Sequence, residues 1–217
     1  MAAIKRMHPR TLIRHAVVRV LKENEDAAAL FADRVFPNRA EQWLTDELPA
    51  CGVYTLSEER LESDVSPDPC ERRIDLGCEL LARMSENVDD MLDALSLAVE
   101  EALQLDAIGA AMGAIVDEAR AQAGLPPLEP VMRDGVLRHP ADTLLLLELR
   151  STSLGVAVDG NREIGVAVLN FDLEYEQPRL SIPLPDFLLA VSGWDVAKPD
   201  GYIDMESRVE FEPSDNE

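Results

Sequence analysis

A change of hydrophobic period within residues 72–105 constrains the fold more than any other feature of the sequence. Apolar and polar residues alternate over residues 72–81, which predicts a strand with one buried face. Its apolar residues are Ile74, Leu76, Cys78 and Leu80. After a polar turn at residues 85–87, apolar residues recur at steps of three and four, which predicts a helix with a buried stripe. That stripe comprises Val88, Met91, Leu92, Leu95, Ala98, Val99 and Ala102. We therefore expect a sheet with a helix laid across it.

Two further stretches have helical patterns. Residues 9–23 begin with Pro9, which suits the first turn of a helix, and carry an apolar stripe. Residues 107–123 are rich in alanine and are followed by Gly124 and several prolines. Gly109 and Gly113 lie one turn apart in this second stretch, and we expect close packing against another helix there. Residues 27–31 form a shorter helical candidate.

A second strand and an acidic connection precede the alternating strand. Residues 49–56 are rich in Val, Tyr and Thr after Pro49, which predicts a strand that pairs antiparallel with residues 72–81. The connection, residues 57–71, is acidic and contains two prolines, so we expect a long loop. Loops of this length inside a compact domain usually serve a partner.

Another pair of strands follows the helices. Residues 143–151 contain a run of leucines, which favours a strand covered on both faces, although periodicity alone leaves a helix open. Residues 165–175 alternate, and the turn signal Asp159-Gly160-Asn161 between the two stretches predicts a hairpin. Residues 125–140 are expected to form an extended linker with a weak strand at Val131 and Met132.

The predicted fold class is α+β, with a mixed or antiparallel sheet of about four to five strands, two or three flanking helices and a C-terminal extended arm. We place the α+β domain at residues 1–176 and an acidic, Pro-rich extension at residues 177–217. The extension contains too many apolar residues for a purely disordered tail, so we expect it to pack on its own core or on a neighbouring subunit. Its candidate contact residues are Phe187, Trp194, Tyr202 and Phe211, and residues 207–212 are a candidate added strand.

The charge of the chain excludes several classes of partner. Its formal net charge is −22 with a pI near 4.4, whereas generic binding to a nucleic-acid backbone needs clustered Lys and Arg. Apolar runs stay far below the roughly 18 residues of a membrane helix, and the first residues lack the apolar core of a signal peptide. We expect synthesis in the cytoplasm and no membrane association.

Signals for catalysis and metal binding are weak. Glycine-rich phosphate loops, G-x-S-x-G, H-E-x-x-H and C-x-x-C motifs do not occur in the sequence. Paired carboxylates such as Asp89-Asp90 are expected on solvated faces, and His8, His15 and His139 lack a second ligand at metal spacing. Cys51 and Cys78 are expected in the core, and Cys70 lies in an acidic segment that makes it a poor nucleophile. We expect no catalytic, cofactor or metal site, and no enzyme.

A resemblance to a known family rests on three quoted stretches. They are the Pro-led strand in Asp46-Glu47-Leu48-Pro49-Ala50-Cys51-Gly52-Val53-Tyr54, the alternating strand of residues 72–81, and the final strand Phe171-Asp172-Leu173-Glu174-Tyr175-Glu176. Together with the N-terminal amphipathic helix, the acidic loop and the helix from Val88, this order resembles the tail terminator proteins of long-tailed bacteriophages. The resemblance covers residues 9–176. Residues 107–140 are longer than compact members need, and the arm is an extension.

The resemblance implies a structural virion protein at the head-proximal end of the tail. It implies a homohexameric ring that caps the tail tube, ends polymerisation of the tube protein and presents a head-tail joining surface to a head-completion or connector protein, while DNA passes through the lumen without specific binding. The loop of residues 57–71 becomes the candidate contact with the tail tube, and the arm the candidate contact with the next subunit or the head side. The loop candidates are Glu58, Glu59, Arg60, Glu62, Asp64 and Asp68.

Two rival classes remain. An acidic DNA mimic that occupies a basic partner fits the net charge equally well, and it predicts a monomer or dimer rather than a ring. An enzyme would need a pocket of convergent polar groups that the sequence does not supply.

Overall fold

The computed structural model describes residues 7–39, 43–62, 70–133, 135–159, 162–177, 189–194 and 205–210. The chain divides into two compact units, Met1–Pro178 and Arg179–Glu217. Among the helices described, none has both the length and the apolar character needed to cross a lipid bilayer.

A mixed five-stranded sheet forms the centre of the first unit, in the order β1-β2-β3-β7-β6. Its strands are β1 (Val35–Pro37), β2 (Ala50–Arg60), β3 (Glu71–Arg83), β6 (Leu144–Asp159) and β7 (Arg162–Glu176). β1 is parallel to β2, and the other neighbours are antiparallel. The predicted α+β class and the predicted antiparallel pairing of β2 with β3 are confirmed.

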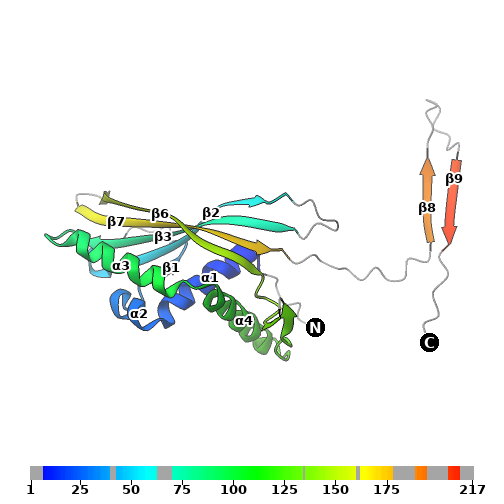
Figure 1. Cartoon of the computed structure of the whole chain (residues 1–217), viewed down its shortest axis with the longest axis horizontal. Helices are drawn as coiled ribbons and strands as arrows, with labels where there is room; N and C mark the ends of the chain where they lie inside the picture. Colours follow the sequence, from blue (N-terminus) through cyan, green and yellow to red (C-terminus); the bar gives the residue numbers. More distant parts are fainter. Residues whose placement is uncertain are drawn as a thin grey trace. The chain divides into compact units, whose positions relative to one another are not determined.

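Helices cover one face of this sheet (Figure 1). They are α1 (Pro9–Glu23), α2 (Glu25–Phe31), α3 (Val88–Ala102) and α4 (Leu105–Gln122). A 3-10 turn at Thr45–Glu47 lies between β1 and β2. The side chains of Ile74, Leu76, Cys78 and Leu80 on β3 are fully buried beneath the helices, as the alternation predicted. Burial of each large apolar side chain contributes about 1.5–3 kcal/mol to folding. Met91 is the exception in the predicted stripe of α3, because it is exposed.

β6 differs from its prediction. The leucine run predicted a strand covered on both faces, but β6 is the edge strand of the sheet, and Leu145, Leu146 and Leu149 are partly exposed. The strand also continues eight residues past the predicted end at Ser151, to Asp159. A run of leucines cannot distinguish a central strand from an edge strand, because both can be apolar.

The two glycines of α4 do pack closely, but against a loop rather than a helix. A Cβ on Gly109 would lie 2.5 Å from the carboxyl carbon of Asp142, and a Cβ on Gly113 would lie 2.7 Å from the ring of His139. α4 does pack against the helix α1, but the glycines themselves face this loop. The glycines let the segment leading into β6 lie directly on α4.

The predicted linker of residues 125–140 contains a small hairpin. It consists of β4 (Val131–Arg133) and β5 (Val136–Arg138), which pair antiparallel. The hairpin is tied to the start of β6, because the guanidinium group of Arg133 donates to the carbonyl oxygen of Asp142 at 3.1 Å.

The second unit contains one described element pair. β8 (Leu189–Trp194) and β9 (Met205–Glu210) form a two-stranded antiparallel sheet of their own. The strand predicted at residues 207–212 therefore overlaps β9.

Candidate functional site

Among the described residues, a small second core covers one end of the helix-free face of the sheet. It is formed by Leu48, Ala50, Leu81 and Ile164 with Trp43 and Val166. Farther along the sheet, the same face carries charged side chains that are open to solvent. Polar residues lie there because the alternation of β3 and β7 sends one side chain in two away from the helices.

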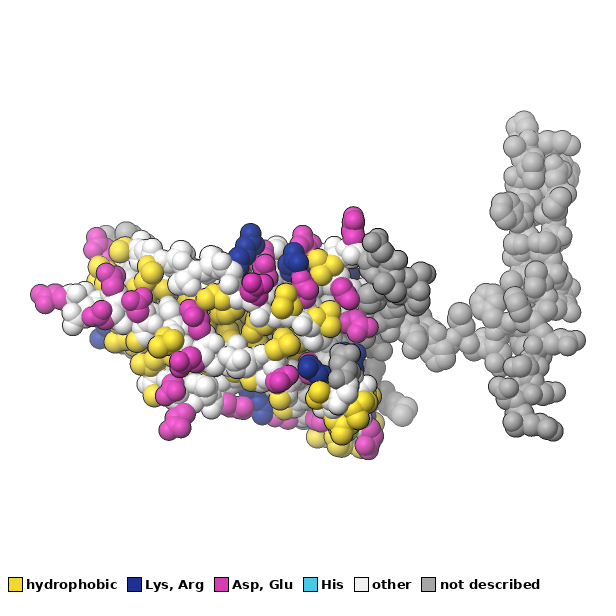
Figure 2. Space-filling view, viewed as in Figure 1, with side chains coloured by type: hydrophobic (Ala, Val, Ile, Leu, Met, Phe, Trp, Pro, Cys, Tyr) yellow, Lys and Arg dark blue, Asp and Glu magenta, His cyan; other side chains and the backbone are white. Residues whose placement is uncertain are grey.

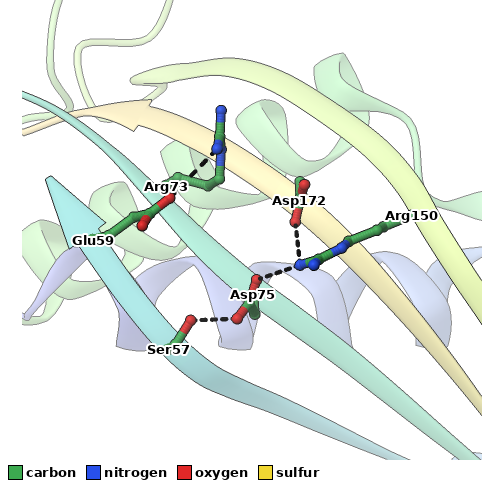
Figure 3. A pocket seen from close by; sticks show the side chains of 6 residues that line it. All are labelled: Ser57, Glu59, Arg73, Asp75, Arg150 and Asp172. Atoms are coloured by element: carbon green, nitrogen blue, oxygen red, sulfur yellow. Dashed lines mark hydrogen bonds and ion pairs between the residues drawn. The ribbon is translucent and has the colours of Figure 1, made fainter. Parts of the chain in front are cut away.

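A charged groove of about 400 Å³ crosses this open face (Figure 3). Its lining residues come from four neighbouring strands and are Ser57, Glu59, Arg73, Asp75, Arg150 and Asp172. We call this set the charged groove.

One end of the charged groove is held by a strong ion pair. The guanidinium group of Arg73 on β3 lies 2.6 Å from the carboxylate of Glu174 on β7 and 3.4 Å from that of Glu59 on β2. The hydrogen bond to Glu174 raises the pKa of Arg73. Arg73 therefore joins three strands across the open face.

The other end holds two opposed carboxylates that share one cation. Asp75 and Asp172 are direct cross-strand partners, an arrangement that is unfavourable for like charges. Arg150 lies between them, 3.6 Å from an oxygen of Asp75 and 3.7 Å from Oδ1 of Asp172, and its side chain is 64 % exposed. The hydroxyl of Ser57 donates to Asp75, whereas Oδ1 of Asp172 is buried and has no hydrogen-bond partner. Arg150 thus balances two opposed carboxylates on the open face.

Part of the predicted acidic loop is strand, and this corrects the sequence analysis. Ser57, Glu58, Glu59 and Arg60 all belong to β2, which has a bulge between Thr55 and Glu58. A bulge adds one residue to a strand and interrupts its alternation of side chains. Residues 57–60 therefore showed no strand pattern in the sequence, and we predicted a loop.

Glu58 is an internal anchor rather than a surface contact. Its side chain is only 11 % exposed and pairs with Arg10 at 3.2 Å and Arg72 at 3.4 Å. It also accepts a hydrogen bond from the buried hydroxyl of Tyr175. Burial, and then the hydrogen bond to Glu58, raise the pKa of Tyr175. Glu58 thus connects α1, β2, β3 and β7.

The other predicted loop residues divide into two groups. Glu59, Arg60 and Glu62 are exposed. Asp64 and Asp68 lie outside the described residues.

The predicted arm residues belong to the second unit. Trp194 is the last residue of β8, and its side chain is not described. Phe187, Tyr202 and Phe211 lie outside the described residues.

Two histidines and two cysteines occupy structural positions. His8 caps α1 by accepting a hydrogen bond from the backbone of Arg10, and His139 pairs with Asp117 at 3.2 Å. Cys51 and Cys78 are fully buried, as predicted. Over the part of the chain that the structure describes, His, Cys, Asp and Glu side chains form no cluster of three suited to a metal ion.

Sequence reasoning missed the charged groove as a unit. The alternating sequences of β3 and β7 predict which residues lie on their polar faces, and these include Arg73, Asp75 and Asp172. The sequence did not predict that Ser57 and Arg150 lie on this face, because both lie at bulges, where the alternation is interrupted.

Comparison with known proteins adds no relationship. The chain matches no protein-family model, and no curated protein matches its sequence.

Proposed function

We propose that this protein is a tail terminator, a structural virion protein of a long-tailed bacteriophage. Six copies form a ring that caps the completed tail tube, stops addition of tube protein and joins the tail to a head-completion protein. The proposal rests on the resemblance given above and on how the chain folds.

One observation carries the proposal: the three stretches behind the resemblance form three adjacent strands. Val53 of β2 pairs with Cys78 of β3, and Cys78 pairs with Leu169 of β7. The Pro-led stretch and the final strand are more than a hundred residues apart in sequence, yet both border the alternating strand. This supports reading them as parts of one ancestral sheet rather than as chance patterns.

The net charge of the whole chain is compatible with a ring through which DNA passes. A net charge of −22 per chain repels phosphate groups, so DNA can move along an acidic lumen without adhering. The exposed Glu59, Arg60 and Glu62 at the end of β2 are the revised candidates for contact with the tail tube. The second unit is the candidate for contact with the next subunit or the head side.

The decisive measurement is the mass of the purified chain. Light scattering after size-exclusion chromatography, at low and high salt and with and without Mg²⁺, should give a species of six subunits, and electron microscopy should show rings. Salt should favour the ring, because screening weakens repulsion between acidic subunits.

A chain that stays a single subunit under every ionic condition and does not cap growing tail tubes would overturn the proposal. If that monomer instead bound a basic DNA-binding protein in competition with DNA, the DNA-mimic class would replace it.

A further inference from the structure

Sheet edges normally carry features that prevent pairing with another chain, such as short strands, prolines, bulges and charges. β1 has three residues and includes Pro37, and β2 has a bulge followed by Glu58, Glu59 and Arg60. The first half of β6 has two irregularities and contains Glu148 and Arg150. These parts of the edges are protected.

The second half of β6 lacks every one of these features. From Ser151 to Asp159 its pairing with β7 is regular, and residues 151–158 contain no charge and no proline. Each side chain over residues 151–157 is exposed, with Leu154 at 52 % and Val156 at 58 %. A Cβ on Gly155 would meet nothing within 4 Å, so another backbone can approach closely there. We call residues 151–157 the open edge.

A second exposed apolar surface lies on the β4–β5 hairpin. Its exposed side chains are Val131, Met132, Val136 and Leu137, with Met132 and Leu137 each 65 % exposed. Figure 2 shows hydrophobic side chains gathered at the lower right, where Figure 1 places this hairpin beside the end of α4. Exposed apolar patches of this kind mark interaction sites.

These two surfaces lie at opposite ends of the first unit (Figure 1). The hairpin is bound to Asp142, just before β6 begins, whereas Val156 lies twelve residues beyond Leu144. At about 3.3 Å per residue, that stretch of strand spans roughly 40 Å. The hairpin therefore cannot reach the open edge of its own subunit.

Acidic side chains lie near the open edge, and arginines lie on the hairpin. Val156 pairs with Gly165, which packs against Val88 at the start of α3, so the exposed Asp89 and Asp90 lie near the open edge. The described charged residues of the hairpin are Arg133 and Arg138, which also form pairs within their own subunit. Arg138 also pairs with Asp142 at 3.3 Å.

We infer that the β4–β5 hairpin of one copy docks on the open edge of the next copy. Val131, Met132, Val136 and Leu137 then cover Leu154 and Val156. Contacts between two different surfaces of the same chain repeat head to tail, and they generate a ring when the rotation closes. The inference rests on the proposed function, because it specifies how the ring of that function is assembled.

Cysteine trapping tests the pairing directly. In a Cys70→Ser background, Met132→Cys protein is mixed with Val156→Cys protein under mild oxidation, and the linked dimer is measured on a non-reducing gel. Cys51 and Cys78 are fully buried and should not react. We expect the linked dimer to form in this mixture and not when Leu97→Cys, an equally exposed leucine on α3, replaces Val156→Cys.

Charge substitution gives an independent readout. Val156→Glu and Met132→Glu should each convert the oligomer to single subunits, while Leu97→Glu leaves the mass unchanged. Because all three side chains are exposed, the melting temperature of the subunit should stay nearly constant.

The outcomes separate this inference from the proposed function. A six-subunit wild-type protein that gives no Met132–Val156 link, or that links equally through position 97, overturns the docking and leaves the ring intact. A specific link in a protein that forms open chains or dimers without rings supports the docking and overturns the terminator.

Discussion

The hydroxyl group of Tyr175 on β7 donates a hydrogen bond to the carboxylate of Glu58 on β2, across the intervening strand β3. Tyr175 is fully buried, and Glu58 is also paired with Arg10 and Arg72. A single carboxylate thereby fixes the start of α1 and the ends of three strands, beside the connection that the proposed function assigns to the tail tube.

Tyr175→Phe should lower the free energy of unfolding by about 1.5 kcal/mol, because it removes a buried hydrogen bond to a charged acceptor. Urea unfolding measures this change. In a Glu58→Gln background, the same substitution should cost clearly less, because the charged acceptor is gone. Equal costs in the two backgrounds would show that the hydroxyl does not stabilise the fold through Glu58.

Alkaline pH should destabilise the protein partly through Tyr54. Burial, and then the nearby carboxylate of Glu79, raise the pKa of Tyr54 to about 12. Tyrosine in an unfolded chain titrates near about pH 10, so the stabilisation is complete below that pH and is lost as pH rises toward about 12. Tyr54→Phe should therefore lose less stability than wild type between pH 9 and pH 11. Tyr175 accounts for part of the loss that remains in the Tyr54→Phe variant. Urea unfolding that shows identical losses for the variant and the wild type would contradict the role of Tyr54.

Gly113→Ala should destabilise the protein by about 1–3 kcal/mol, although alanine normally favours a helix over glycine by about 1 kcal/mol. The added Cβ would lie 2.7 Å from the ring of His139 and 2.9 Å from its Cβ, and these atoms cannot swing away. The melting temperature shows whether the substitution stabilises or destabilises the protein. Gly77→Ala is the control, because nothing lies closer than 3.4 Å to its Cβ position, and it should be neutral or slightly stabilising.

Arg150→Gln should destabilise the protein by about 0.5 kcal/mol at low salt, because it leaves Asp75 and Asp172 opposed without a shared cation. The effect should shrink at about 1 M salt, where screening is strong. Adding Asp172→Asn to Arg150→Gln should recover the lost stability, because the repulsion between the two carboxylates disappears. Unfolding measured at both salt concentrations checks this, and a loss that is independent of salt would point to packing instead.

Much of the fold could be predicted from local pattern. The alternation around Ile74 and Leu76, and the step of three and four from Leu92 to Val99, each reflect the geometry of one element. The boundaries of α1 followed from Pro9 and the end of its apolar stripe. These features depend on neighbours within a few residues, so the sequence alone contains them.

Only the tertiary structure decided which charges are anchors and which edge is open. Glu58 and Glu59 are adjacent acids, yet a bulge and the positions of Arg10, Arg72 and Tyr175 bury the first and expose the second. Arg150 meets Asp75 and Asp172 because β3, β7 and β6 are neighbours, an order that no local pattern encodes. The exposure of the β6 leucines likewise depends on the position of this strand at the edge of the sheet. Hydrophobicity favours burial of a strand, but the order of strands in the folded sheet determines whether neighbours cover it.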